Sequence, residues 1–425
     1  MYDIFSLKDF TFPKDFLWGS AVAGHQVEGM NVNSQNWFDE YNTDRYAEKS
    51  AMACNHYNMY KQDIITLKKL GHKIFRLSVE WSRIEPENGV YCEDAVRHYI
   101  DELSFLKENG IKVFVTLVHF TVPLWFYRLG GFSKKENIKY FERYLEYLIP
   151  KITDYVDYWN VLNEFNLGNS EESINFKLNS LKYHALGYHI IKKYSNKQVS
   201  TAHAYIQYMP YRMYDKYDNI LANYRDWQDN EFFLHAIRTG EILYPEREGE
   251  IDMSVKDTCD FWSVNMYVRE LIDSRAVHGK AKRYNHKELK MIDIPFYLEE
   301  MYPEGMLANM TRLTDKPIFI SENGCACNDD RFRIVYISLY LSSLYDAICC
   351  GADVRGYLYW SLMDNYEWGS YIPKFGLLSV DADTFRREKK PSADFYHDII
   401  ENNGFSQEIL RKYIKEIPSL ANDIF

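Results

Sequence analysis

Short β-rich runs alternate with longer amphipathic runs along this whole chain, and this alternation restricts the fold more than any other feature. Repeated strand and helix units of this kind build a parallel sheet that is covered by helices. Eight such units predict one closed (β/α)8 barrel, the TIM barrel, in the α/β class. The eight β-rich runs are FLWGSAVA from Phe16, KIFRLSV from Lys73, KVFVTLV from Lys112, YVDYWNVL from Tyr155, QVSTAHAY from Gln198, DFWSVNMY from Asp260, KPIFISE from Lys316 and RGYLYWSL from Arg355.

Helices are predicted between the strands, at residues 56–71, 95–110 and 137–154. The first two segments end in Gly, a residue that commonly terminates helices. The segment 208–258 is long and irregular, and we expect extra helices and loops in it. Because no Pro/Ser-rich linker or low-complexity tract divides the chain, residues 1–425 are predicted to form a single catalytic barrel domain.

Charge and composition exclude several classes of protein. With 46% apolar and 26% charged residues the chain can bury a large core, so disorder is not expected. A formal net charge of -11 and the lack of a Lys/Arg-rich run argue against a nucleic-acid partner. The 12 His show no HExxH or comparable spacing, so we expect no metal and no cofactor.

The cysteines and the apolar runs bear on the compartment. Seven Cys is an odd number and none is spaced as CxxC, which indicates a reduced, cytoplasmic protein. The pairs Cys325/Cys327 and Cys349/Cys350 are too close together for an ordinary disulfide framework. Asp and Lys interrupt the first 16 residues, and no later apolar run approaches membrane-spanning length in this interpretation. We therefore predict no signal peptide and no membrane contact.

Polar side chains follow three of the predicted strands, where the active sites of such barrels lie. His119 follows strand three, Glu164 ends strand four and Glu322 ends strand seven. We place strands four and seven on opposite sides of the ring, so that two carboxylates face one another across its mouth. Glycoside hydrolysis needs such a pair, because one carboxyl protonates the leaving oxygen while the other attacks or assists at the anomeric carbon. A single Glu of this kind would be interpreted as a solvated residue at the end of a strand. Two Glu residues, each next to an Asn at the end of an apolar strand, favour a catalytic pair.

Eight motifs occur in one order along the chain. They are FLWGSAVAGHQVEG at Phe16, FRLSVEWSRIEP at Phe75, TLVHFTVPLWF at Thr116, WNVLNEFN at Trp159, NMY at Asn265, ISENG at Ile320, YWSLMDNYEW at Tyr359 and FGLLSVD at Phe375. Together they resemble glycoside hydrolase family 1, the β-glucosidase and β-galactosidase family, over nearly the whole chain. A single NE or ENG would be weak evidence, whereas eight motifs in order are specific.

The resemblance implies a role for each matched residue. It implies Glu164 as the acid/base and Glu322 as the nucleophile, with Arg76 and Tyr267 beside Glu322. The implied residues around the sugar are Gln26, His119, Asn163, Asn265, Trp360, Glu367, Trp368 and Phe375. Without this resemblance, Trp360 would fit plain core packing equally well. A retaining mechanism needs carboxyl groups about 5 to 5.5 Å apart. We expect Arg76 and Tyr267 to lower the pKa of Glu322, and an apolar setting with a nearby charge to raise that of Glu164.

The predicted function is therefore a retaining β-glycosidase that hydrolyses terminal, non-reducing β-D-glycosyl residues through a covalent glycosyl-enzyme. A β-glucosidase is favoured, because glucose is the commoner sugar in the family. The expected partner is a small-molecule β-glycoside. The sequence leaves open the preferred sugar, the natural aglycone, the balance between hydrolysis and transglycosylation, and the oligomeric state.

The sequence fits rival functions less well, and it departs from the family pattern at a few positions. A 6-phospho-β-glycosidase should carry a Ser/Lys/Tyr phosphate-binding group, but Lys374 is followed by Phe375 and not by Tyr. A thioglucosidase should lack Glu164, and a binding protein that has lost catalysis should lack part of the catalytic set. Phe165 replaces the usual Pro, Phe120 a common Trp, and Met266 a common Tyr. Apparent shortening after Trp368 and after Glu164 suggests an open aglycone site.

Overall fold

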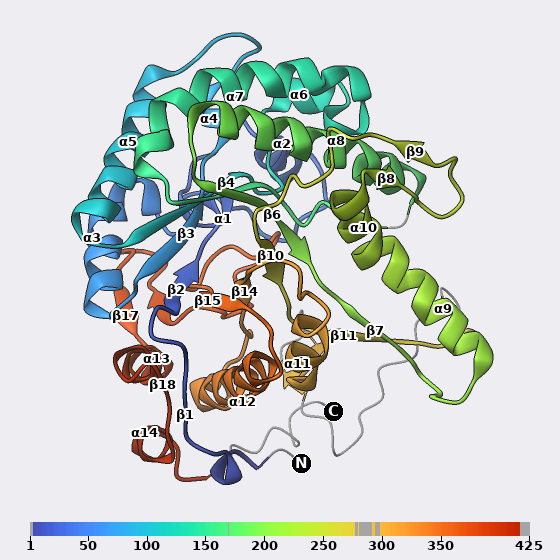
Figure 1. The fold of residues 1–425 in the computed structure, drawn as a ribbon. Coiled ribbons are helices and arrows are strands. Elements are labelled where there is room, and N and C mark those ends of the chain that lie inside the picture. Colours follow the sequence, from blue (N-terminus) through green and yellow to red (C-terminus); the bar gives the residue numbers. More distant parts are fainter. Residues whose placement is uncertain (1–2, 169, 277–278, 280–290, 294–297, 417–425) are drawn as a thin grey trace.

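The computed structural model describes residues 3–168, 170–276, 279, 291–293 and 298–416. Eight parallel strands close into a barrel in the order β10-β14-β15-β2-β3-β4-β5-β6 (Figure 1). These strands are β2 (Leu17–Ala21), β3 (Ile74–Ser78), β4 (Lys112–Val118), β5 (Tyr158–Asn163), β6 (Gln198–Ala204), β10 (Trp262–Asn265), β14 (Ile318–Asn323) and β15 (Val354–Trp360). Each overlaps one of the predicted β-rich runs, so the predicted TIM barrel is confirmed.

A helix of the outer ring follows each barrel strand (Figure 1). In chain order they are α3 (His56–Lys69), α5 (Glu93–Glu108), α7 (Ile138–Ile152), α8 (Glu171–Tyr194), α10 (Phe232–Thr239), α11 (Glu304–Met310), α12 (Asp330–Cys349) and α13 (Pro391–Glu401). The first three are the helices that the sequence predicted. Gly71 and Gly110 stand two residues past the ends of α3 and α5 with φ of +76° and +75°. Glycine adopts this left-handed conformation without the penalty that a Cβ atom brings, so both helices end there.

Aromatic side chains fill the barrel interior at its amino-terminal end. Phe114, Tyr158, Phe261 and Phe319 lie on or beside four different strands, and their ring centroids are 4.9 to 6.1 Å apart. Such a layer makes the barrel a packed core rather than a pore. The polar side chains described below lie toward the carboxyl ends of the strands.

Short elements make up the segments between the barrel strands and the outer helices. The helices among them are α1 (Gly24–Val27), α2 (Gln35–Asn42), α4 (Trp81–Ile84) and α6 (Leu124–Arg128). The remaining strand pairs are β8 (Glu241–Ile242) with β9 (Glu250–Ile251), β12 (Met291–Asp293) with β13 (Leu298–Glu300), and β16 (Leu378–Val380) with β17 (Arg387–Lys389). The single turns are η1 (Ile4–Ser6), η2 (Gly131–Ser133), η3 (Lys135–Asn137) and η4 (Thr153–Tyr155).

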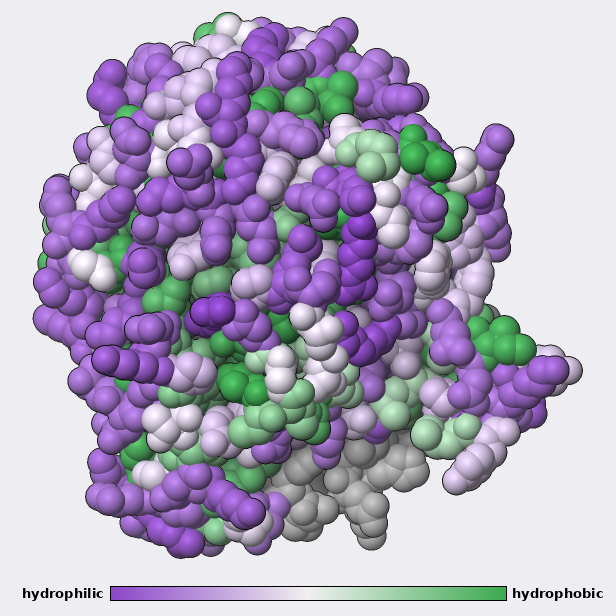
Figure 2. All heavy atoms as spheres, in the orientation of Figure 1, coloured by the Kyte–Doolittle hydropathy of each residue, from purple (hydrophilic) through white to green (hydrophobic). Residues whose placement is uncertain are grey.

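An arm projects from the barrel between β6 and β10 (Figure 1). It contains β7 (Gln207–Pro210), α9 (Lys216–Asp226) and a π-helical turn, η5 (Trp227–Glu231), that leads into α10. β7 pairs in parallel with β11 (Arg269–Ile272). Figure 2 shows apolar residues beside hydrophilic ones on this arm, and Tyr214 near its tip is 102% exposed. These elements are the extra helices expected in the irregular segment.

The two ends of the described chain meet below the barrel. β1 (Phe10–Thr11) pairs antiparallel with β18 (Gly404–Phe405), and α14 (Gln407–Tyr413) follows. The Trp18 indole donates to Asn403 at 2.8 Å, which links the first barrel strand to the segment after the last outer helix. Contacts between residues far apart in the chain therefore hold the two ends together. Trp18 and Asn403, for example, are 385 positions apart.

Two expectations about the fold need correction. In the ring, β5 and β14 are separated by only β6 and β10, so they face each other across the mouth without being diametrically opposed. Among the described residues, α12 is long and apolar enough to cross a membrane, contrary to our prediction, although 67% of its most apolar window is buried inside the protein. Its Ser and Tyr residues hid this apolar character in the sequence. Whether residues 1–425 form one domain stays a prediction.

Candidate active site

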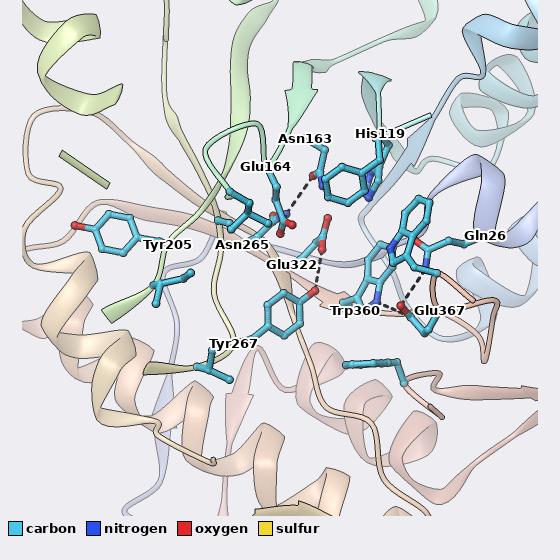
Figure 3. A pocket seen from close by; sticks show the side chains of 17 residues that line it. Gln26, His119, Asn163, Glu164, Tyr205, Asn265, Tyr267, Glu322, Trp360 and Glu367 are labelled. Carbon is cyan, nitrogen blue, oxygen red and sulfur yellow. Dashed lines mark hydrogen bonds between the residues drawn. The ribbon is translucent and has the colours of Figure 1, made fainter. Parts of the chain in front are cut away.

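A cavity of about 370 Å³ opens at the carboxyl ends of the barrel strands (Figure 3). It is lined by Gln26, His119, Phe120, Asn163, Glu164, Leu167, Ala204, Tyr205, Ile206, Asn265, Tyr267, Val268, Glu322, Trp360, Glu367, Trp368 and Phe375. All the predicted site residues except Arg76 are in this lining. Arg76 is buried on β3 and reaches the cavity through its contacts with lining residues.

Glu322, on β14, is held between a cation and a phenol. Arg76 forms a buried ion pair with it, and the Tyr267 hydroxyl donates to its other oxygen at 2.8 Å. Arg76 is itself fixed, because its Nε donates to the Thr116 hydroxyl at 2.9 Å and its second terminal nitrogen to Asn163 at 2.6 Å. The Glu322 carboxylate is therefore bound at both oxygens and aimed into the cavity (Figure 3).

Glu164 follows β5 directly and has a different environment. Its backbone adopts φ of +48°, a left-handed conformation that costs a residue with a Cβ about 1 kcal/mol or more. Among the described residues, its carboxylate accepts a hydrogen bond from the Asn265 amide at 2.8 Å. Burial and the charge of Glu322 raise the pKa of Glu164 to about 8, so this carboxyl is protonated at neutral pH.

The pKa of Glu322 does not follow our prediction. Arg76 and Tyr267 lower it as expected, but burial acts more strongly and the net direction is upward from the ordinary value. The prediction of a lowered pKa was therefore wrong. The surroundings of the two groups nevertheless differ as expected, because Arg76 is bound to Glu322 and no cation is bound to Glu164 among the described residues.

A second polar group lies on the other side of the cavity from Tyr205 (Figure 3). The Gln26 amide donates to Glu367 and to Asn365, each at 3.0 Å, and the Trp360 indole donates to Glu367 at 3.1 Å. Burial raises the pKa of Glu367 to about 8. The hydrogen bonds fix the position of Glu367, and burial keeps it largely protonated at neutral pH.

Besides the Tyr205 hydroxyl, three buried polar atoms of this cavity have no hydrogen-bond partner among the described residues. They are Oε1 of Gln26, Nδ1 of His119 and Nδ2 of Asn163. Burial and the positive charge of Arg76 hold the pKa of His119 well below its usual range, so its ring is neutral. Buried polar groups normally find partners. These atoms are therefore suited to a ligand rich in hydroxyl groups.

Aromatic rings flank the same polar group. His119 stacks on Trp360 with centroids 5.9 Å apart and on Trp368 with centroids 6.3 Å apart. Phe120 lies edge-on against Trp368 at 5.1 Å. Trp360 is 4% exposed, yet it lines the cavity, so core packing alone does not describe its position. Flat aromatic faces of this kind are typical of sites for sugar rings.

Sequence reasoning missed two kinds of residue. Asn365, Thr116 and Ser321 hold the predicted residues in place, and each carries a hydroxyl or amide within a quoted motif. The strand ends also contribute Leu167, Ala204, Tyr205, Ile206 and Val268 to the cavity. The signal for this second group is position alone, because each follows a barrel strand by only a few residues.

The departures from the family pattern are accommodated locally. Phe165 is buried against Phe233 of α10, with ring centroids 5.3 Å apart, so it anchors the segment after Glu164. Met266 is buried and accepts a weak bond from Asn309 at 3.5 Å. Lys374 lines a different cavity of about 310 Å³, together with Cys54 and Tyr371, and not the cavity of Glu164.

Known proteins resemble this chain over nearly its full length. The sequence pattern of "Glycosyl hydrolase family 1" matches residues 8–405. The "Beta-glucosidase A" of Acetivibrio thermocellus is 29% identical over 93% of this chain and 99% of its own length. The "6-phospho-beta-galactosidase" of Streptococcus mutans is 28% identical over 92% of this chain and 98% of its own length.

A solved structure agrees with these sequence matches. The "beta-glycosidase from Pyrococcus horikoshii" superposes with a TM-score of 0.83 at 32% identity, over 95% of this chain and 98% of that one. At such identities the relatives share the fold and the reaction class, while their names differ in the sugar that they indicate.

Proposed function

This chain belongs to glycosyl hydrolase family 1, a family of β-glycosidases, and on that premise we propose that it is a β-glucosidase acting on unphosphorylated substrates. The supporting observation is the charge of the cavity. Three Glu residues line it, and no Lys or Arg is found among the described residues of its lining. A phosphate dianion needs cationic partners, and here it would meet carboxyl groups instead.

The resemblance to a 6-phospho-β-galactosidase supports the rival proposal of a phosphorylated substrate. The position of Lys374 weighs against it. This cation faces the cavity of Cys54 and Tyr371, while the next residue, Phe375, faces the cavity of Glu164. An extended segment turns neighbouring side chains to opposite sides. We therefore infer that the Lys374 side chain is not available to bind a phosphate in the cavity of Glu164.

In the proposed mechanism, Glu322 attacks the anomeric carbon while Glu164 donates its proton to the leaving oxygen. The ion pair with Arg76 and the bond from Tyr267 keep Glu322 ionised and oriented. Formation of the glycosyl ester removes the negative charge of Glu322, which had raised the pKa of Glu164. Glu164 then accepts a proton from water, and the water cleaves the ester with net retention.

The sugar itself is proposed to lie between the catalytic pair and Glu367. Gln26 and His119 offer buried polar atoms that have no partner among the described residues, and Trp360 offers an aromatic face. The Asn163 amide nitrogen, next to Glu164, also has no partner in the described part of the chain and is suited to a sugar 2-hydroxyl. A hydrogen bond to that hydroxyl strengthens in the transition state and so contributes to rate.

The deciding experiment compares p-nitrophenol release from the β-glucoside, the β-galactoside and their 6-phosphates. We expect kcat/KM to be highest for the β-glucoside and to vanish with Glu322→Ala. Glu172→Ala, which changes an exposed Glu on α8, is the matched control and should keep full activity. A preference for either 6-phosphate would overturn the proposal of an unphosphorylated substrate, and a preference for the β-galactoside would overturn glucose.

We also propose that the protein works in the cytoplasm. All seven Cys are free thiols, and Cys349 and Cys350 are both exposed. Exposed thiols persist in reducing compartments and oxidise readily outside them. Cell fractionation with an antibody against the protein tests this, and recovery from the external medium would contradict it.

A further inference from the structure

The wall of the cavity consists of two sides that come from different parts of the barrel. One side, which we call the sugar side, is formed by residues after β2, β4 and β15, among them Gln26, His119 and Glu367. The other, the leaving-group side, is formed by residues after β5, β6 and β10, which are neighbours in the ring. Glu164 follows β5, so a group that it protonates leaves over this second side.

The leaving-group side is aliphatic. Glu164 and the residues next to the catalytic pair, Asn163, Asn265 and Tyr267, are polar, but beyond them and Tyr205 the lining residues of this side are Leu167, Ala204, Ile206 and Val268. Leu167 is 38% exposed, and Ile206 and Val268 are half-buried, so this side continues from the catalytic pair to the solvent. A group bound there contacts hydrocarbon along its length.

Polar side chains on this side are already engaged by the protein. The Asn166 amide donates to the carbonyls of Ala204 and Asp229 at 2.8 and 2.9 Å, and its oxygen accepts from the Ala204 amide at 3.1 Å. The Asn265 amide is bound to Glu164 and Asn163. Neither side chain is left to bind the hydroxyls of a leaving group.

Among the lining residues of this side beyond the catalytic pair and its neighbours, the Tyr205 hydroxyl is the exception, since it has no partner among the described residues. Figure 3 shows its ring directed away from Glu164 and Glu322, so the hydroxyl does not face the bond to be cleaved. The unpaired atoms of Gln26, His119 and Asn163, by contrast, surround the catalytic pair and the sugar side. Capacity to bind hydroxyl groups is thus concentrated around the catalytic pair and on the sugar side of the cavity, and not along Leu167, Ile206 and Val268.

We propose that the aglycone is an apolar alkyl or aryl group rather than a second sugar, and that Leu167, Ile206 and Val268 determine this specificity. The proposal rests on the proposed β-glucosidase function and names the class of substrate. A sugar in the aglycone position would bring several hydroxyls against hydrocarbon and lose their water without new partners. An alkyl chain gains from the same burial.

The second half of the reaction follows the same preference. An apolar alcohol on the leaving-group side can take the place of water. The bond between the anomeric carbon and Glu322 breaks, a bond to the alcohol oxygen forms, and the hydroxyl proton passes to the Glu164 carboxylate. The side chains that accept an apolar leaving group therefore also favour an apolar alcohol as acceptor.

The test compares hexyl β-glucoside with cellobiose by glucose release, counting one glucose for each hexyl glucoside cleaved and two for each cellobiose. The sugar hydroxyl of cellobiose is the better leaving group, so chemistry alone favours cellobiose and any preference for hexyl glucoside reports binding. We expect a kcat/KM at least tenfold higher for hexyl glucoside. Equal or better use of cellobiose, with both substrates hydrolysed, would overturn this proposal and leave the β-glucosidase function standing. No hydrolysis of either would instead count against that function.

Two variants test whether the aliphatic side chains cause the preference for hexyl glucoside over cellobiose. Ile206→Asn and Val268→Asn should each lower the ratio of hexyl glucoside to cellobiose kcat/KM at least fivefold. Inhibition by glucose, which binds the sugar side, should stay unchanged and thereby exclude a general structural defect. Ile220→Asn is the matched control, because Ile220 is 55% exposed on α9 and away from the cavity. An unchanged ratio in both cavity variants would refute their role in specificity.

Discussion

The surroundings of Glu322 and Glu164 differ although the two residues share a side-chain type, a fold position and a cavity. Glu322 is bound to the guanidinium of Arg76 and the hydroxyl of Tyr267. Among the described residues, the Glu164 side chain is hydrogen-bonded by the Asn265 amide alone, and the negative charge of Glu322 raises its pKa. Burial raises the pKa of both. The neighbours, and not burial, therefore decide which carboxyl keeps its proton and which one loses it.

Of the changes that test this difference, removing Glu322 should cause the largest loss of activity. Glu322→Ala deletes the group that forms the covalent bond, and the loss of a nucleophile typically lowers kcat by about 10⁴-fold or more. The loss should be similar for good and poor leaving groups, because no substrate can bypass the attack. Steady-state rates on p-nitrophenyl and alkyl β-glucosides measure it. Residual activity that depends strongly on the leaving group would argue against Glu322 as nucleophile.

Removing Glu164 should give a smaller effect that depends on the substrate. General acid catalysis contributes about 10²- to 10⁴-fold. We expect a loss of this size with Glu164→Ala on an alkyl glucoside, and a much smaller loss on a 2,4-dinitrophenyl glucoside, whose leaving group needs no proton. A burst of dinitrophenol should then appear, because the glycosyl-enzyme forms but is hydrolysed slowly. Equal losses on both substrates would show that Glu164 is not the acid.

Removing the hydrogen bond from Tyr267 to Glu322 should cause a moderate loss of activity. Tyr267→Phe removes the hydroxyl that donates to Glu322 at 2.8 Å, and a bond to a charged group is worth about 1.5 to 3 kcal/mol. We expect kcat/KM to fall about 10- to 100-fold and the acidic limb of the pH profile to move to higher pH. Tyr144→Phe removes a buried hydroxyl without a partner among the described residues, and its activity should be unchanged.

The pH profile of the native protein tests the order of the two pKa values. Glu164 must be protonated to act as acid, so kcat/KM should fall as the pH rises through about 8, its raised pKa. The fall is about tenfold per pH unit above that point. Activity must also fall at low pH, where Glu322 becomes protonated. If the Glu164→Gln variant shows the same fall of kcat/KM at high pH, another group and not Glu164 is responsible for that fall.

The smallest effect concerns stability. The pKa of Glu367 is raised to about 8 by burial, so folding loses stability as the pH rises from the ordinary carboxyl value through about 8. Glu367→Gln removes this loss. Its melting temperature should exceed that of the native protein by about 2 °C or more at pH 8, with little difference at pH 5. A difference that does not grow with pH would contradict the assigned direction.

The barrel could be predicted from the sequence because the residues of each strand form a recognisable local pattern. Runs such as KVFVTLV are apolar, β-branched and bounded by helix-forming segments, and β4 falls within that run. The site residues could be predicted for a similar reason. Glu164 and Glu322 stand at strand ends, and the topology of a barrel brings all carboxyl ends together whatever their separation in the chain.

Properties that depend on several elements at once could not be predicted. The net pKa of Glu322 depends on how much solvent the surrounding loops exclude, and no motif records that. The direction of Lys374 depends on how the segment after β15 packs against Cys54, which comes from the other end of the chain. The arm that carries α9 has no repeated pattern, so only its irregularity was visible.

The closure of the barrel by β15 against β2 has a consequence for the order in which the protein matures. Gln26 and Glu367, which bond to each other, are 341 positions apart. On a ribosome, the first six barrel strands are released long before Glu367 is made. The sugar side is therefore completed only near the end of translation, and such distant contacts slow folding. Until then the nascent chain exposes the apolar edge of β2, which makes it a candidate client for chaperones.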